Sequence, residues 1–341
     1  MTVLLEKRRL IVSPGLVPVQ QRREDKFGHP QNVDVDLTIG LINNMPDGAL
    51  KATERQFMRL LRRAAGDVRI DFHCFSLPSV RRSQSEQGRL EGQYTDIAEI
   101  DRLQIDGLIV TGAEPNAATL PQEMFWREFR DIVDWAKHNT RSTIWSCLAA
   151  HAAVLHLDDI ERKRLETKCS GIYDCLDVSQ HWLMQGLPAP FKVAHSRLNE
   201  VRADDLTTKG YQLLSYSTRG GVDSFAKDFG SQFIFFQGHP EYDALSLQRE
   251  YMRDLARFLA GERDEYPAIP VGYFDAVTEA RLISFEKRAR AKREPTLAAE
   301  LPGLALRRDI PAGGAASVIF GNWLGFLAKG AAAAQPACQG G

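Results

Sequence analysis

Apolar runs and polar turns alternate along the first half of the chain at the spacing of an α/β protein. Residues 37–42 and 105–110 are continuous apolar runs, the pattern of strands buried on both faces, and 68–75 alternates like a further strand. Apolar positions recur at helical spacing over about 51–64 and around 126–135. This alternation of strand and helix predicts an α/β fold with a doubly wound, mostly parallel sheet.

The second half of the chain predicts shorter strands and one long helix. The strands are expected near 190–194, 212–216, 222–226 and 232–236. The helix is expected over about 244–260, with a buried face formed by Tyr251, Met252, Leu255, Phe258 and Leu259. Residues 79–94 are polar and are expected to form a loop at the edge of the domain.

These patterns also predict how the chain is divided. We expect an N-terminal arm over 1–35, a main domain over 36–262, a C-terminal extension over 263–330 and a disordered tail over 331–341. The extension contains an apolar run at 318–327, which must bury itself against the main domain.

Composition and charge exclude several classes of partner. The 341 residues are 44% hydrophobic and 26% charged, with a net charge of −1, so neither nucleic acid nor an anionic membrane is an expected partner. No apolar run approaches the roughly 20 residues that cross a bilayer, and the early basic residues are unlike a secretory signal. Five cysteines without paired metal-ligand spacing indicate reduced thiols in the cytoplasm and no metal.

Cys147 stands where an apolar, β-branched run becomes an alanine-rich, helix-forming run. At a tight strand-to-helix turn, a side chain faces unpaired N–H groups and the positive end of the helix dipole. A thiol in that place has its thiolate favoured, which makes it a nucleophile at neutral pH. The alternative is a small buried hydrophobic residue, and this stretch alone favours that alternative.

A second candidate is the run His239-Pro240-Glu241, which also follows a very apolar strand. Proline prevents regular continuation, and a carboxylate two residues from a histidine can bond one ring nitrogen and orient the other. Alone, the run fits a surface turn equally well. Ligand sites of parallel sheets lie beyond the carboxyl ends of the strands, so the two signals together predict a Cys147-His239-Glu241 triad.

These residues carry a family resemblance. The run 236–241 after the Cys147-Leu148-Ala149 turn is similar to the histidine and nucleophile motifs of class I glutamine amidotransferases, whose sheet is flavodoxin-like. A narrower family on that fold, the homoserine O-succinyltransferases and O-acetyltransferases, resembles the chain from about residue 36 to 328. The matching segments are 41–46, 54–61, 106–113, 167–173, 194–197, 238–243 with Arg253, and 322–324.

The resemblance implies a two-step, ping-pong acyl transfer in methionine biosynthesis. Cys147 would take the acyl group from an acyl-coenzyme A, and His239, oriented by Glu241, would deprotonate the hydroxyl of homoserine. The backbone N–H of Leu148 is the natural oxyanion donor. By family position Lys168, Ser196 and Arg253 would contact substrate, with Arg253 pairing with the carboxylate of the amino acid. No cofactor is implied beyond acyl-coenzyme A as co-substrate, and a homodimer is expected from the family.

Three positions differ from the family pattern. Leu148 replaces the usual tryptophan. His151 replaces a glutamine and is either a polar group behind the site residues or a packed helix residue, and the second interpretation is favoured. Asn116 stands at the position associated with acyl preference, which is glycine in succinyl-transferring and glutamate in acetyl-transferring members. Asparagine is uncharged and can donate a hydrogen bond to a succinyl carboxylate, which favours succinyl over acetyl. Glu114 nearby is an unexpected negative charge.

Other functions remain open from the sequence. The acceptor could be serine or a related hydroxy amino acid instead of homoserine. A glutamine-hydrolysing amidotransferase is a second alternative, although the chain has no recognisable ammonia-accepting domain. A non-catalytic binding module is a third alternative, and it would not need the three residues Cys147, His239 and Glu241.

Overall fold

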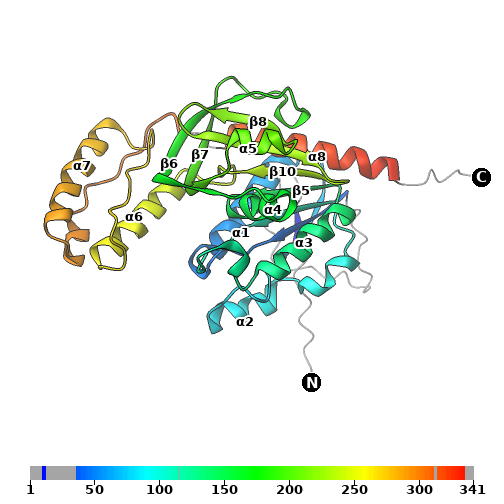
Figure 1. The fold of residues 1–341 in the computed structure, drawn as a ribbon, viewed down its shortest axis with the longest axis horizontal. Coiled ribbons are helices and arrows are strands. Elements are labelled where there is room, and N and C mark those ends of the chain that lie inside the picture. The colour runs from blue at the N-terminus through cyan, green and yellow to red at the C-terminus, as the bar shows by residue number, and fades with distance from the viewer. Residues whose placement is uncertain (1–9, 13–35, 114, 311–312, 335–341) are drawn as a thin grey trace, which may run out of the picture. The chain divides into compact units, whose positions relative to one another are not determined.

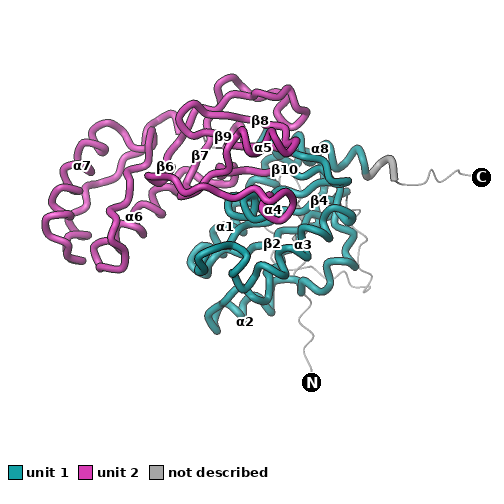
Figure 2. The backbone as a smooth tube through the Cα atoms, in the orientation of Figure 1, with its two compact units in different colours: residues 1–153, 227–234, 317–341 teal, residues 154–226, 235–316 magenta. Residues whose placement is uncertain are grey.

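The computed structural model describes residues 10–12, 36–113, 115–310 and 313–334 (Figure 1). The chain divides into two compact units (Figure 2). Unit 1 comprises Met1–Ala153, Lys227–Ile234 and Ser317–Gly341, and unit 2 comprises Val154–Ala226 and Phe235–Ala316.

From β3 (Ile70–Phe75) to β5 (Ser142–Ser146) the strands of unit 1 are parallel, and the edge strand β1 (Leu10–Val12) is antiparallel to β3. The sheet also contains β2 (Leu37–Ile42), β4 (Gly107–Thr111) and the first residues of β10 (Gln232–Phe236). The strands lie in the order β1-β3-β2-β4-β5-β10. Strand β2 is parallel to β3 and β4, β4 is parallel to β5, and only the short β1 is described as antiparallel, on β3. The predicted α/β fold with a parallel sheet is therefore confirmed.

Helices cover both faces of this sheet, as a doubly wound fold requires. Ser142 and Trp145 are three residues apart in β5 and so point to opposite faces. Trp323 of α8 (Gly314–Ala334) donates a hydrogen bond from Nε1 to Ser142 Oγ at 3.0 Å. On the other face the ring of Phe129, from α3 (Trp126–Asn139), lies 5.6 Å from that of Trp145. The apolar run 318–327 is thus buried as expected.

Unit 1 also contains a helix that the sequence did not predict. The segment 79–94, expected as a loop, forms α2 (Gln84–Gln93). This helix buries none of its side chains, so apolar periodicity could not reveal it. It starts with a cap, in which Ser83 Oγ accepts from the N–H of Glu86, and the preceding Arg82 donates to the carbonyl of Asn43 at 3.2 Å. The remaining helical elements of unit 1 are α1 (Asp47–Ala64), η1 (Ile97–Arg102) and η2 (Leu120–Gln122).

The strands of unit 2 are antiparallel. They are β6 (Lys163–Asp177), β7 (Phe191–Glu200), β8 (Gln212–Ser217) and β9 (Gly221–Asp228), with β6 pairing with β7 and β8, and β8 with β9. The strands expected near 190–194, 212–216 and 222–226 are found. Strand β6 was missed because its exposed first half lacks a buried alternation.

The helices of unit 2 include α5 (Ala203–Thr208), α6 (Ser246–Leu259), α7 (Ala276–Ala291) and the short η3 (Trp182–Met184) and η4 (Pro295–Glu300). Tyr251, Leu255, Phe258 and Leu259 of α6 are buried in one cluster with residues of α7. Met252 was wrongly assigned to this face. It is 42% exposed because it follows Tyr251 by one position, 100° around the helix.

Two expectations about the ends of the chain concern residues that are only partly described. Within the expected arm, residues 10–12 form β1, and the rest of 1–35 lies outside the described residues. Helix α8 continues to Ala334, so it includes the first residues of the expected tail, and 335–341 lie outside the described residues. Among the described residues, no helix combines the length and the apolar composition needed to span a membrane.

Candidate active site

Cys147 occupies the turn between β5 and α4 (Leu148–Asp158), in a left-handed backbone conformation with φ of 52°. Its carbonyl accepts hydrogen bonds from the N–H groups of Ala150 and His151 at 3.0 and 3.3 Å, so the helix begins directly behind the thiol. A non-glycine residue in this conformation costs about 1–3 kcal/mol, and such strain is typical of nucleophile turns between strand and helix. The half-buried thiol therefore has the position that the sequence predicted.

The start of α4 lies against the end of β4. A Cβ placed on Gly112 would overlap Leu148 Cβ and lie 3.1 Å from the backbone nitrogen of Ala149. Only glycine permits this approach, which sets the position of the Leu148 N–H expected to serve as oxyanion donor. His151 is 2% exposed within α4, and this burial fits a packed helix residue and a polar group behind the site equally well.

Asn116 follows β4 in unit 1 and is exposed. Its N–H and that of Ala117 both donate to Glu123 Oε1 at 2.7 Å. Glu123 is only 8% exposed, so a buried carboxylate holds the backbone of this loop in place. Glu114 lies outside the described residues.

His239 and Glu241 form the pair that the sequence predicted, in unit 2. His239 Nδ1 lies 2.8 Å from Glu241 Oε1, and both residues are buried. The ring of Tyr242 stacks on the imidazole with centroids 4.1 Å apart. The carboxylate and the stacked ring together hold the imidazole so that Nε2 points away from Glu241, as a general base requires.

Glu250 of α6 contacts three side chains of unit 2. Its two carboxylate oxygens accept hydrogen bonds from Ser196 Oγ and Tyr242 OH, and Lys168 Nζ lies 3.6 Å from Oε2. Burial would raise the pKa of Glu250, but Lys168 and the two hydroxyl groups outweigh it and lower the pKa below its usual value. Glu250 is therefore a carboxylate at neutral pH.

Asp254, one helical turn after Glu250, gathers cations. Its carboxylate lies 3.2 Å from Lys168 Nζ, 2.9 Å from a guanidinium nitrogen of Arg253 and 3.3 Å from one of Arg263. Burial opposes ionisation of Asp254, yet Lys168 and Arg253 lower its pKa. The Arg253 side chain is 54% exposed, so its guanidinium is held by Asp254 and still faces solvent.

The structure thus brings together five of the predicted residues in unit 2: Lys168, Ser196, Arg253, His239 and Glu241. Cys147, Leu148 and Asn116 lie in unit 1. The sequence analysis missed Tyr242, Glu250 and Asp254, which connect the unit 2 residues. One signal was available, because Glu250 and Asp254 are four residues apart on a helix and so share a face with each other.

Unit 1 has a thiol on a strained strand-to-helix turn, and unit 2 has a histidine–carboxylate pair with an ordered charged network. These groups are typical of an α/β enzyme that transfers acyl groups. The particular family follows from comparison with known proteins. The model of the family "Homoserine O-succinyltransferase" matches residues 22–332, and this chain belongs to that family. The resemblance seen in the sequence is confirmed, and so is the class of enzyme, an acyltransferase.

Two relatives are similar over almost their whole length. The homoserine O-succinyltransferase of Bradyrhizobium japonicum is 58% identical over 331 residues, which cover 97% of this chain and 100% of that protein. The homoserine O-succinyltransferase of Rhodopseudomonas palustris is 52% identical, covering 96% and 99%. Among solved structures, a glutamine amidotransferase of Thermotoga maritima matches 79% of this chain and 95% of its own at 12% identity, with a TM-score of 0.44, too loose for any argument.

Proposed function

We propose that this protein transfers a succinyl group from succinyl-coenzyme A to the hydroxyl of homoserine, a step of methionine biosynthesis. Membership of the family and the names of the relatives support the reaction. The observation that carries the proposal is the network in unit 2, in which His239 and Glu241 adjoin charged groups of both signs. A general base beside a cation and an anion suits an acceptor that carries an amino group, a carboxylate and a hydroxyl.

In the proposed first step, the Cys147 thiolate attacks the thioester carbonyl. The backbone N–H of Leu148 donates to the developing oxyanion, and the thiolate of coenzyme A leaves. The acyl group remains on Cys147 as a new thioester. In the second step His239 takes the proton of the homoserine hydroxyl as its oxygen attacks this thioester, and the Cys147 thiolate is released. The chemistry needs acyl-coenzyme A as co-substrate and no metal or further cofactor.

We propose that the acceptor is bound through its two charged groups. The exposed guanidinium of Arg253 pairs with the carboxylate of homoserine, because a planar guanidinium can donate two parallel hydrogen bonds to a carboxylate. The ionised Glu250 accepts the ammonium group, and Lys168 and Ser196 hold Glu250 in place at the edge of the substrate.

Asn116 supports the choice of succinyl over acetyl. A glutamate in this place would repel the free carboxylate of a succinyl group, whereas an asparagine side chain can donate a hydrogen bond to it. A homodimer in the cytoplasm is part of the proposal. The described cysteines, all of them free thiols, are consistent with a reducing compartment.

One experiment tests the function directly. The purified protein is incubated with succinyl-coenzyme A or acetyl-coenzyme A, and the peptide that contains Cys147 is searched by mass spectrometry for the acyl adduct. We expect a succinyl adduct that homoserine discharges faster than serine does. If serine discharges the adduct and homoserine does not, serine replaces homoserine as the proposed acceptor. Absence of any adduct, together with glutaminase activity, would replace the proposal by the amidotransferase alternative.

A further inference from the structure

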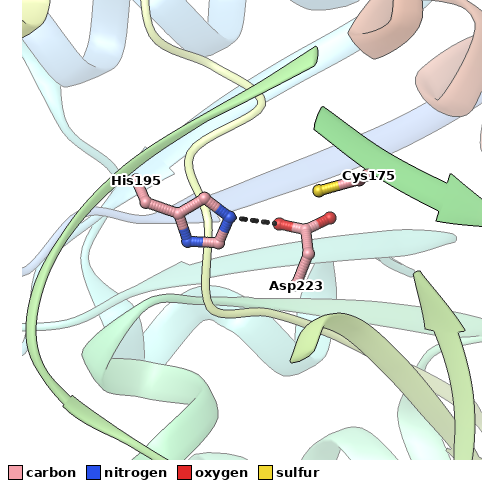
Figure 3. A group of neighbouring side chains, drawn as sticks. All are labelled: Cys175, His195 and Asp223. Carbon is pink, nitrogen blue, oxygen red and sulfur yellow. Dashed lines mark ion pairs between the residues drawn. The ribbon is translucent and has the colours of Figure 1, made fainter. Parts of the chain in front are cut away.

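Three polar side chains lie together in the interior of unit 2, outside the residues assigned to the reaction. Cys175 of β6, His195 of β7 and Asp223 of β9 are each at most 1% exposed, and their polar atoms lie within 4.8 Å of one another (Figure 3). His195 Nε2 is 3.3 Å from Asp223 Oδ1, and Ser215 Oγ donates to Asp223 Oδ2 at 2.7 Å. Burying polar groups costs free energy, so these side chains are expected to have a structural or functional role that offsets this cost.

This cluster lies directly beneath the loop that carries His239. A Cβ on Gly238 would overlap Asp223 Oδ1 and Val193 Cγ1 and lie 3.1 Å from His195 Cε1, so the loop backbone rests on the buried pair and on Val193. The N–H of Gln237 donates to the carbonyl of Asp223 at 2.7 Å. The N–H of His239 donates to the carbonyl of Ala194, the neighbour of His195, at 2.8 Å.

We propose that His195 and Asp223 are positioning residues, which hold the backbone of the 237–239 loop and thereby the imidazole of His239. The proposal rests on the function of His239 in the proposed reaction. Glu241 and Tyr242 orient the ring of His239, but they cannot set the height of its backbone above the sheet. The buried pair does so, because the loop has a glycine where any side chain would collide with it. Misplacement by about 1 Å can cost about 100-fold in rate, so a rigid support has catalytic value.

The same three residues have the spacing of metal ligands, and a bound metal ion is the competing explanation. Two observations favour positioning over a metal site. Gly238 covers the pair, and the carboxylate of Asp223 already accepts from Ser215.

The test compares Asp223→Asn with the control Cys175→Ala in the full chain. Asparagine keeps the volume of Asp223 but has one acceptor oxygen in place of two. It therefore cannot present an oxygen to both His195 Nε2 and Ser215 Oγ, and the side chain beneath Gly238 must shift. We expect kcat for homoserine acylation to fall by about 10- to 100-fold, with the KM for homoserine changed by less than about twofold, because Arg253 and Glu250 are untouched. Cys175→Ala keeps the pair beneath the loop, so its kcat is expected to stay within about twofold of wild type.

Hydrogen exchange supplies a readout that does not depend on activity. In Asp223→Asn we expect the backbone N–H groups of Gln237 and His239 to exchange at least about tenfold faster, and those of β6 to be unchanged. If Asp223→Asn does not fold, His195→Gln and Gly238→Ala disturb the same contact from the other two sides and are expected to show the same two effects.

Three results would overturn the proposal: unchanged kcat and exchange in all of these variants, a rise in KM as large as the loss of kcat, or a stoichiometric metal that Cys175→Ala removes together with activity. If the wild-type protein acylates neither homoserine nor serine, the proposed function fails instead. The exchange measurement still decides whether the buried pair supports the loop.

Discussion

The two units position their chemical groups in different ways. In unit 1 the backbone sets the position: Cys147 is held by its own left-handed conformation, by the helix that starts behind it and by Gly112, which follows β4 and packs against Leu148. In unit 2 side chains set the positions: Glu250 and Asp254 connect a lysine, two arginines and two hydroxyl groups beside the His239–Glu241 pair. A position that is set by the backbone tolerates almost no added atom nearby. A network of charged side chains can lose one member while the others keep their positions.

This difference suggests a division of labour within the proposed reaction. Unit 1 would take up the acyl group, and unit 2 would bind and activate the acceptor. Substitutions in unit 1 should therefore affect formation of the acyl adduct, and substitutions in unit 2 should affect its discharge by homoserine.

The largest effect is expected from Cys147→Ala. Without the thiol no acyl-enzyme can form, so turnover should fall by at least about 1,000-fold and the adduct should be absent from the mass spectrum. Cys74→Ala, at a cysteine in β3, is the matched control and should still form the adduct on Cys147. Full activity of Cys147→Ala would refute the mechanism.

Glu250→Gln should weaken acceptor binding and leave adduct formation intact. Loss of a charge-assisted contact with the ammonium group costs about 1.5–3 kcal/mol, so the KM for homoserine should rise by roughly 10- to 100-fold in steady-state kinetics. Glu286→Gln, which breaks an ion pair with Arg290 on α7, is the control. Slower adduct formation in Glu250→Gln would contradict the division between the units.

The pH dependence of the same variant has a definite sign. The pKa of Glu250 is lowered in the folded protein, so its ionisation stabilises the fold above pH 4.5, its ordinary pKa, and this contribution is lost as the pH falls through the lowered value. The stability difference between wild type and Glu250→Gln, measured by urea unfolding, should therefore shrink as the pH falls below 4.5.

Gly112→Ala should destabilise unit 1 through steric overlap, with no change of charge. Its new methyl group would overlap Leu148, and such overpacking costs about 1–3 kcal/mol of unfolding free energy. We expect slower adduct formation as well, since the start of α4 must move, with an unchanged KM for homoserine. Gly48→Ala in α1, where no neighbouring group lies within 4 Å of the added Cβ, should lose no unfolding free energy and should form the adduct at the wild-type rate.

Asn116→Glu should change the choice of acyl group and nothing in unit 2. The new carboxylate repels succinate more than acetate, so the ratio of rates with acetyl- and succinyl-coenzyme A should rise by roughly tenfold. Asn116→Gln is the uncharged control of the same length as glutamate. An unchanged ratio in the glutamate variant would remove Asn116 from acyl selection.

The smallest effect concerns the strain at Cys147. Glycine adopts a φ of 52° without the penalty that alanine pays, so Cys147→Gly should be more stable than Cys147→Ala by up to about 1 kcal/mol in thermal or urea unfolding. Equal stabilities would mean that the turn relaxes once the thiol is gone, and that the backbone of unit 1 is less rigid than the structure indicates.

Local patterns of the sequence were sufficient for much of unit 1 and for the His239–Glu241 pair. Buried parallel strands are continuous apolar runs, and the partners of the pair are two residues apart, so both are visible in a short window. Helix α2 and strand β6 were missed for the complementary reason. One buries no side chain and the other begins with an exposed half, so neither leaves an apolar period in the chain.

The sequence by itself therefore determined the α/β class, the strand-to-helix turn at Cys147 and the histidine–carboxylate pair, because each depends on neighbours within a few positions. Only the tertiary structure decided what surrounds them. Lys168 meets Asp254 across 86 positions and Ser196 meets Glu250 across 54, and His195 and Asp223 come to lie beneath Gly238 from separate strands. Such contacts arise from the packing of strands and helices against one another, and no periodicity along the chain records which distant side chains that packing will join.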